Sequence, residues 1–260
     1  MPELPEVETY RRYFDSTSLK QLITNISCAD ERLLKQPFND FREYLIGQSF
    51  TSTERIGKYL FVCTSGKKVL VLHFGMTGNL DYYHESIDRP RFAHIVYHLE
   101  GGYNLAFLNK RKFGWNTLTD DISAYQQQVG LSTDATKITK DAFLQALSRR
   151  KTAIKPVLLD QKVTAGIGNW LADEILYQSR IHPEKKVQDL TEEECLSIFQ
   201  NMQRILETSI AEQAIYRNFP KNYFIHIREA DATCHHTGVP IEKIKVGGRA
   251  TYYSPEWQKL

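Results

Sequence analysis

The sequence predicts an α+β fold with two domains. From about residue 20 to 117, short apolar and β-branched runs such as YLFVCTS and KVLVLHFG are separated by glycines and polar turns, as in a β-rich domain. From about 140 to 213, apolar residues recur every three or four positions, as in packed helices. The last 40 residues return to short strands with glycine turns. A chain of 260 residues is long enough to bury two cores.

The elements follow from these patterns in chain order. Val7, Tyr10 and Phe14 have helical spacing, which predicts a short helix over residues 3–16, ahead of the strands. The polar, turn-rich segment QQQVGLSTDATKI, at about 126–138, is interpreted as a linker. We then expect helices in the sequences DAFLQALSRR, AIKPVLLDQ, NWLADEILYQSR and EEECLSIFQNMQRILETSIAEQ.

Composition narrows the class of protein. No apolar run approaches the roughly 20 residues of a membrane span, and the charged start MPELPEVETYRRYF is unlike a signal peptide. The cysteines have no paired spacing, which favours reduced thiols. We therefore expect no membrane partner and a location in the cytoplasm or, if the source is eukaryotic, in the nucleus. We also expect a monomer. The formal charge of +2 does not by itself indicate a polyanionic partner, so local clusters must carry that inference.

Two features point to phosphate. In VTAGIGN, residues 163–169, Gly166 and Gly168 permit close approach of backbone to a ligand, and Asn169 opens a helix whose free N–H groups suit an anion. The alternative is a glycine turn with Asn169 as its cap. Basic residues flank aromatic ones, as in nucleic-acid-binding surfaces, although solvated charge is the alternative. These basic residues are Arg149, Arg150, Lys151 and Lys155 near the turn, and Lys110, Arg111 and Lys112 beside Phe113 and Trp115.

The N-terminus offers a nucleophile. Removal of Met1 would leave Pro2 as a secondary amine, and α-amino groups have a reference pKa of about 7.7–8.0. Near neutral pH such an amine is partly unprotonated and can attack the anomeric carbon of a deoxynucleotide to form an iminium ion. Glu3, next to it, can transfer protons. A charged N-terminal cap without chemistry is the alternative.

Eight motifs together resemble one family. They are PELPEVET, RIGKYLF, HFGMTGNL, RKFGW, KTAIKPVLLD, AGIGNWLADEILY, IHPE and GGRATYY. Their order and spacing are those of the formamidopyrimidine-DNA glycosylase family, whose relatives include the endonuclease VIII type enzymes. The resemblance implies a bifunctional DNA glycosylase and AP lyase that acts on double-stranded DNA containing oxidised bases or abasic sites, without a cofactor.

The family architecture gives the expected domains. The resemblance implies an N-terminal β-sandwich over 1–127, a linker over 128–138, a helix-two-turn-helix domain over 139–220 and a terminal β-hairpin finger over 221–260. Enzymes of this kind turn the damaged nucleotide out of the duplex, and loosened pairing at a lesion lowers that cost.

The resemblance also implies roles for single residues. Pro2 matches the Schiff-base nucleophile, Glu3 the acidic catalytic residue, and Lys58 the lysine of the lyase reaction. Arg249 of the finger, which matches the arginine that contacts DNA phosphate near the lesion, is grouped with these catalytic residues. The expected DNA-binding residues are the trio Met76, Arg111 and Phe113 that fills the hole left by the extruded base, Lys151 and Asn169 at phosphates, and Lys155 of the basic cluster near the glycine turn. A thioether and an aromatic ring can wedge into a base stack, and a guanidinium can bond the orphaned base.

Two departures from the family pattern concern DNA contacts and substrate. Phe92 stands where the family has a DNA-binding histidine, while His94 and His73 are interpreted as structural. The segment from Ile215 to Cys234 is shorter than in members specialised for oxidised purines. Formamidopyrimidines, oxidised pyrimidines and hydantoins are therefore the expected substrates, and excision of 8-oxoguanine is left open.

A third departure concerns the finger. The four zinc-ligand positions hold Cys234, Thr237, Ser254 and Trp257, so we expect no metal and an apolar packing in its place. A substitute ligand set drawn from Cys234, His235, His236 and Glu256 is the alternative. For function, the alternative to an active enzyme is a catalytically silent binder of damaged DNA.

Overall fold

The computed structural model describes residues 1–260, which form two compact units. One comprises Met1–Pro2 and Glu6–Val129, and the other Glu3–Pro5 and Gly130–Leu260. The division after residue 129 falls inside the segment predicted as a linker. Helix α1 (Leu4–Thr17) confirms the helix predicted over 3–16, and its first residues belong to the second unit.

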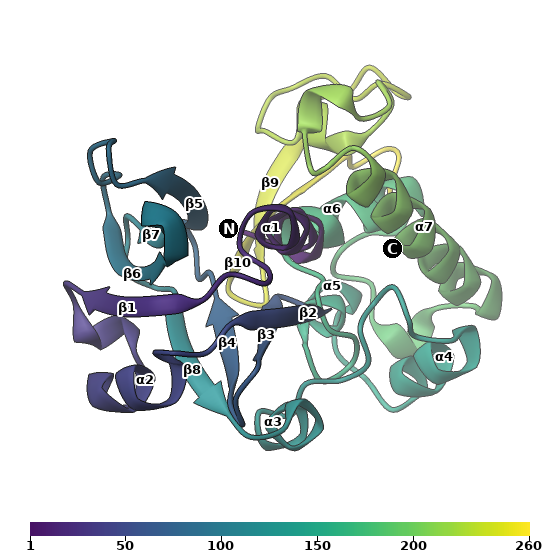
Figure 1. Ribbon diagram of the computed structural model, residues 1–260. Helices are drawn as coiled ribbons and strands as arrows, with labels where there is room; N and C mark the ends of the chain where they lie inside the picture. The colour runs from purple at the N-terminus through teal and green to yellow at the C-terminus, as the bar shows by residue number, and fades with distance from the viewer. The chain divides into compact units, whose positions relative to one another are not determined.

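The first unit is a sandwich of two four-stranded antiparallel sheets, with strand orders β1-β6-β7-β5 and β2-β3-β4-β8 (Figure 1). The strands are β1 (Ile23–Cys28), β2 (Phe50–Ile56), β3 (Tyr59–Thr64), β4 (Val69–His73), β5 (Gly78–His84), β6 (Ala93–Leu99), β7 (Tyr103–Asn109) and β8 (Trp115–Thr119). Apolar side chains of both sheets form one core with Val7 and Phe14 of α1. The predicted β-sandwich is confirmed.

Two short helices of this unit were not predicted. They are α2 (Phe38–Leu45) and α3 (Ile122–Gln128). In α2 the buried residues Phe41 and Leu45 are four apart, as one helical face requires, but a single pair in eight residues is too short a pattern to separate from the surrounding strands. Three-residue 3₁₀ turns at Glu31–Leu33 and Glu100–Gly102 complete the unit.

The second unit is built on four helices that match the predicted ones. They are α4 (Lys140–Ser148), α5 (Ile154–Leu159), α6 (Asn169–Gln178) and α7 (Glu192–Ala211), and the shorter 3₁₀ elements are Val187–Asp189, Tyr216–Asn218 and Phe224–Ile227. Helix α7 begins with a capping box, in which Thr191 and Glu194 each satisfy the other's backbone N–H. Its apolar face packs with those of α4, α5 and α6 in one core.

The segment predicted as a linker is part of this core. Leu131, Ala135 and Ile138 are buried. Ala135 N–H donates to the carbonyl of Ala165, and Ala165 N–H donates to that of Thr133, each over 2.9 Å. Its polar residues suggested a loop, and it is one, but three apolar side chains fix it to the helical unit.

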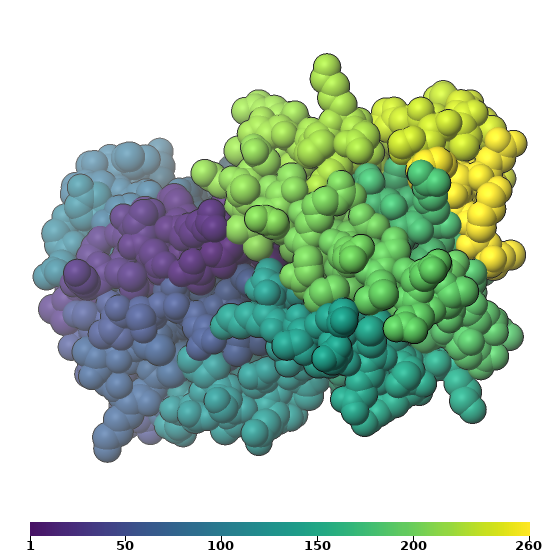
Figure 2. All heavy atoms as spheres, turned by 90° about the vertical axis from the view of Figure 1, so that its right-hand side faces the viewer, coloured from purple at the N-terminus to yellow at the C-terminus, as the bar shows by residue number.

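The chain ends in a hairpin of β9 (Glu242–Val246) and β10 (Arg249–Tyr253). Gly247 and Gly248 form its two-residue turn with φ of 56° and 78°, the left-handed pair that a tight hairpin of this type needs. The hairpin is part of the second unit rather than a separate domain, and the last residues of the chain lie against the helical residues (Figure 2). Across the whole model, none of the helices combines the length and apolarity needed to cross a membrane.

Candidate active site and nucleic-acid interface

Glu3 occupies the N-terminus of α6. Its carboxylate accepts the N–H of Trp170 over 2.9 Å and that of Leu171 over 3.2 Å, and the residue is 2% exposed. Gly168 is the N-cap and offers no side-chain cap, so Glu3 performs that task from the other end of the chain. The positive end of the helix favours the carboxylate anion. Of the two readings of this stretch, a phosphate site or a glycine turn before a capped helix, the two hydrogen bonds to Glu3 favour the second for the N–H groups of Trp170 and Leu171.

Gly166 and Gly168 form the socket that admits Glu3 and Leu4. A Cβ on Gly168 would lie 2.1 Å from Cδ of Glu3, and one on Gly166 would lie 2.4 Å from Cδ1 of Leu4. Gly166 also has φ of 116°, and its carbonyl accepts the N–H of Leu4 over 3.2 Å. The sequence correctly indicated a close backbone approach here. What approaches is the protein's own N-terminal segment, which leaves half-buried Pro2 directly before the anchored Glu3.

Asn169 connects this helix end to the hairpin. Its Nδ2 donates to the carbonyl of Ala250 over 2.9 Å, while its buried Oδ1 has no hydrogen-bond partner. Arg249, the residue before Ala250, is exposed, and a Cβ on Gly247 in the hairpin turn would lie 2.6 Å from Cγ of Pro156. The Arg249 backbone is therefore held close to the start of α6.

Lys155 is not a surface lysine. Its Nζ lies 2.6 Å from Oδ1 of Asp173 and 2.7 Å from Oγ1 of Thr251, and it donates to the carbonyl of Ala250 over 3.3 Å; the side chain is fully buried. Burial lowers the pKa of Lys155 and raises that of Asp173, and their contact opposes both shifts. Arg228 adds a second cation 2.7 Å from Asp173. This burial speaks against the DNA contact predicted for Lys155, which instead fixes strand β10 to helices α5 and α6.

Two other basic residues of the cluster that contains Lys155 differ in their surroundings. Lys151 is exposed between α4 and α5, as a phosphate-binding residue must be. Arg150 instead pairs with Asp160 over 3.1 Å. The DNA-binding prediction therefore stands for Lys151 as a prediction.

In the first unit, Lys58 lies in the two-residue turn between β2 and β3. Gly57 precedes it with φ of 60°, and Ile56 pairs with Tyr59 across the turn. The positive charge of Lys58 helps to lower the pKa of His73 to about 4, although burial of the imidazole is the larger cause. A neutral His73, whose Nδ1 accepts the N–H of Gly75 over 3.3 Å, fits the structural role predicted for it.

Met76, Arg111 and Phe113 are displayed by two turns of the same unit. Met76 is 38% and Phe113 56% exposed, and Cζ of Arg111 lies 5.2 Å from the centre of the Phe113 ring. Arg111 N–H donates to Oγ1 of Thr77 over 3.0 Å, which joins the turn that carries Met76 to the one that carries Phe113. The structure brings the predicted trio together on one exposed surface.

Two family models match the chain. The model described as "Formamidopyrimidine-DNA glycosylase N-terminal domain" matches residues 1–116, and the one described as "Formamidopyrimidine-DNA glycosylase H2TH domain" matches residues 129–219. The chain belongs to the formamidopyrimidine-DNA glycosylase family. It is accordingly a DNA glycosylase of base excision repair, of the bifunctional class that also has AP lyase activity.

Relatives match over the full length. The formamidopyrimidine-DNA glycosylase of Streptococcus mutans is 31% identical over 273 residues, and the alignment covers 100% of both proteins. That of Desulforamulus reducens is 32% identical over 276 residues, with 100% of this chain and 99% of the relative covered. The Lactococcus lactis enzyme, solved non-covalently bound to DNA containing an AP site, aligns with a TM-score of 0.91 at 28% identity over 99% of this chain and 100% of that one.

The finger of this family member is held by aromatic stacking. Trp257 lies face to face with His236 at 3.9 Å, Cζ of Arg180 is 4.0 Å from the Trp257 ring, and Trp257 Nε1 donates to the carbonyl of Tyr177 over 3.0 Å. His236 is thus engaged in the stack, and no group of three His, Cys, Asp or Glu side chains is placed to hold a metal.

Cys234 lies beneath that stack. Burial raises the pKa of its thiol, but the nearby hydroxyl groups of Ser254, Thr237 and Tyr177 outweigh this and lower the pKa to about 7. The Tyr177 hydroxyl is 3.3 Å from Sγ. Hydroxyl groups and an indole ring therefore surround the one cysteine that remains at the four ligand positions.

The short segment between Ile215 and Cys234 is pinned by α6. The fully buried carboxylate of Glu174 accepts the N–H of Phe224 over 3.0 Å and that of Ile225 over 2.8 Å, and Asp173 binds Arg228. This anchoring could not be foreseen from the sequence, because acidic residues inside a helix usually face solvent.

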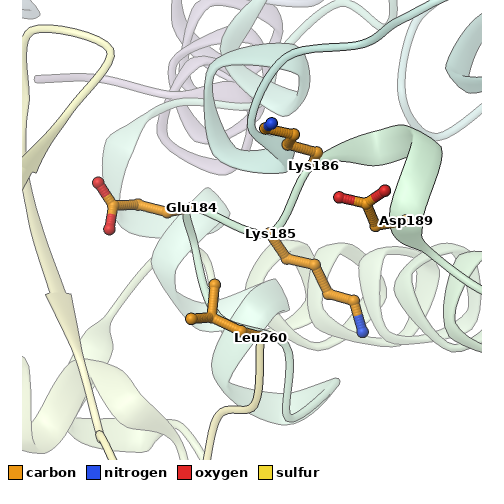
Figure 3. Close-up of a pocket in the computed structure, with 5 residues that line it drawn as sticks. All are labelled: Glu184, Lys185, Lys186, Asp189 and Leu260. Atoms are coloured by element: carbon orange, nitrogen blue, oxygen red, sulfur yellow. The ribbon is translucent and has the colours of Figure 1, made fainter.

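A separate pocket of about 320 Å³ carries none of these residues. It is lined by Glu184, Lys185, Lys186, Asp189 and Leu260. Glu184, Lys185 and Lys186 point in three different directions (Figure 3), and Lys185 is paired with Glu194 over 2.8 Å. The pocket has no converging group that would make it a candidate site.

Proposed function

We propose that the protein excises oxidised bases from duplex DNA and cleaves the strand through a Schiff base at Pro2 once Met1 is removed. The observation that carries this proposal is the fixed carboxylate of Glu3, held by two backbone N–H groups of α6 in the residue directly after Pro2. Such anchoring orients an acid–base group beside the amine. We place the reaction in the cytoplasm, or in a eukaryotic nucleus, and the active species as a monomer.

The chemistry proceeds in two stages. The Pro2 amine attacks C1′ of the damaged nucleotide as the glycosidic bond breaks; the electron pair of that bond leaves with the base, which takes up a proton, and the attacking nitrogen loses its proton. The C1′–O4′ bond then breaks, O4′ takes up a proton, and the nitrogen lone pair forms the C1′=N⁺ iminium; Glu3 is assigned to proton transfer at the base and at O4′. The resulting iminium acidifies the C2′ proton. Loss of that proton expels the 3′ phosphate, a second elimination expels the 5′ phosphate, and water then releases Pro2. Lys58 is assigned to the lyase stage.

The DNA contacts follow the exposed cations and wedge residues. Arg249 and Lys151 in the second unit are exposed and suit phosphates, while Met76, Arg111 and Phe113 suit the space left by the extruded base. Asn169 is assigned to the same phosphate surface through its remaining amide proton. Related enzymes solved with DNA containing an abasic site support duplex DNA with such lesions as the partner.

The anchored segment bears on substrate. A related MutM was solved with DNA containing carbocyclic 8-oxo-G, and a Lactococcus lactis variant with Fapy-dG DNA. Here the residues from 215 to 234 are few and tied to Glu174 and Asp173, which leaves little chain to close over a purine. We therefore propose formamidopyrimidines, oxidised pyrimidines and hydantoins as substrates, with weaker excision of 8-oxoguanine.

A lesion panel tests this proposal. Duplexes carrying an abasic site, formamidopyrimidine, thymine glycol, a hydantoin or 8-oxoguanine are incubated with the protein, and strand cleavage is measured without added alkali. We expect cleavage at the abasic site, formamidopyrimidine, thymine glycol and the hydantoin, and weaker cleavage at 8-oxoguanine. Glu3→Gln should slow base release by about 10²-fold or more. Tight binding without cleavage of any duplex would replace the enzyme by the silent-binder alternative.

A further inference from the structure

Phe92 is an exposed aromatic residue in an unfavourable backbone conformation. Its φ is 65°, in the left-handed region that bulky side chains rarely adopt, and 42% of its surface is exposed. An exposed ring contributes little to the core, and glycine would fit this backbone more easily. An aromatic kept at a strained, exposed position points to a contact outside the protein.

The backbone of Phe92 is tied to buried Asn109. The N–H of Asn109 donates to the carbonyl of Phe92 over 3.0 Å, and the carbonyl of Asn109 accepts the N–H of Lys112 over 3.2 Å. The side chain of Asn109 donates to the carbonyl of Phe74 over 3.3 Å and accepts from Thr77 over 3.4 Å. Three separate segments therefore meet at one fully buried amide.

Those three segments carry the exposed apolar side chains of this surface. Phe74–Thr77 includes Met76, Asn109–Lys112 leads into Phe113, and Phe92 lies on the third. The backbone of Phe92 is thus tied, through Asn109, to the two segments that carry the wedge residues.

Cations flank the Phe92 ring. Cζ of Arg91 lies 5.4 Å and Nζ of Lys110 lies 6.0 Å from its centre, and both residues are exposed. A base that stacks on this ring takes the place of one of these exposed cations, which can then face a phosphate of the DNA. Neither an apolar peptide nor a lipid would use both properties.

We propose that Phe92 is a second DNA-stacking residue, which takes the face of a base in the duplex that Met76 and Phe113 open. This inference rests on the proposed function, since it needs DNA on that surface. A stacking contact does not neutralise a phosphate charge. The contribution of Phe92 to DNA affinity is therefore nearly independent of salt concentration.

The test measures the dissociation constant for a duplex with a tetrahydrofuran abasic analogue at several salt concentrations. Phe92→Gly and Phe92→Asn both tolerate φ of 65°, so neither variant strains the fold. We expect about 5- to 100-fold weaker binding for both, an unchanged slope of affinity against salt, and near wild-type affinity for Phe92→Trp. Ile87→Gly removes another exposed apolar side chain, 63% exposed, from the same unit and is the control expected to bind normally.

Unchanged affinity of Phe92→Gly, or a loss accompanied by a shallower salt slope, would overturn stacking by Phe92. Phe113→Ala separates this failure from that of the proposed function. If Phe113→Ala weakens binding and Phe92→Gly does not, only the stacking inference fails; if neither variant matters, the DNA surface itself is misplaced.

Discussion

At the residue scale, the carboxylate of Glu3, the proposed acid–base group, is fixed by residues far away in the sequence. Two N–H groups of α6 orient its carboxylate, and two glycines leave room for it. The arrangement explains why GIG precedes this helix: either glycine with a side chain would press on the N-terminal segment.

Gly168→Ala tests that socket. The added Cβ would lie 2.1 Å from Cδ of Glu3, whereas the φ of −121° suits alanine, so the expected defect comes from displacement of the carboxylate alone. We expect base release to slow by about 10- to 100-fold with DNA affinity largely retained. Single-turnover excision is measured for Gly168→Ala, Glu3→Gln and the double variant. If Gly168→Ala acts by displacing the Glu3 carboxylate, the double variant should be little slower than Glu3→Gln. Losses of rate that add fully in the double variant would contradict this.

Glu8 gives a prediction for pH. Burial alone would raise its pKa, but hydrogen bonds and charges from Arg11 and Arg55 outweigh burial and lower it below 4.5. A lowered folded-state pKa contributes stability that is present above the unfolded value and lost as pH falls through the folded value. We therefore expect Glu8→Gln to lower Tm at pH 7 and the difference to shrink below about pH 4.5. A difference that stays constant down to pH 3 would refute this linkage.

At the element scale, the hairpin is held by a buried ion pair. Lys155 in α5 binds Asp173 in α6 and two groups of β10, so one ammonium joins three elements. Lys155→Met would leave Asp173 with Arg228 as its remaining cation. We expect a loss of about 3 kcal/mol of stability, and a lower affinity for DNA because the backbone of Arg249 loses its support.

Thermal unfolding and DNA binding of Lys155→Met test this role. Lys151→Met, on the same segment, is the matched control. Lys151→Met should keep the wild-type Tm. Its affinity for DNA should fall by the loss of one phosphate contact, and the dependence of affinity on salt concentration should become shallower. Normal stability of Lys155→Met would show that the pair does not hold the hairpin.

The finger stack gives a second prediction for an element. Trp257→Ala removes the ring between Arg180 and His236 and the hydrogen bond to Tyr177, so we expect a loss of about 2–4 kcal/mol and weaker DNA binding. A chelator should leave the Tm of the wild type unchanged. Stoichiometric zinc in the purified protein, or a Tm that falls with chelation, would contradict an aromatic finger.

At the scale of the whole molecule, periodic patterns predicted what depends on local sequence. The strands of the first unit, α1 and the four helices of the second unit follow from spacing, whereas the sandwich and the grouping of Met76, Arg111 and Phe113 followed from the family resemblance. Lys155 was misjudged because KTAIKPVLLD does not reveal which side of α5 faces the core. The pairing of Glu3 with α6 spans more than 160 positions, so no local pattern could show that the helix end was already occupied.

Pro2 as the nucleophile can be tested directly by borohydride reduction of the mature protein on a duplex with an abasic site, followed by proteolysis and mass spectrometry of the trapped peptide. We expect a covalent adduct on the N-terminal peptide, at the proline nitrogen, and we expect Lys58→Ala to be trapped at the same place. An adduct on Lys58 or another lysine, or none while the strand is still cleaved, would contradict it.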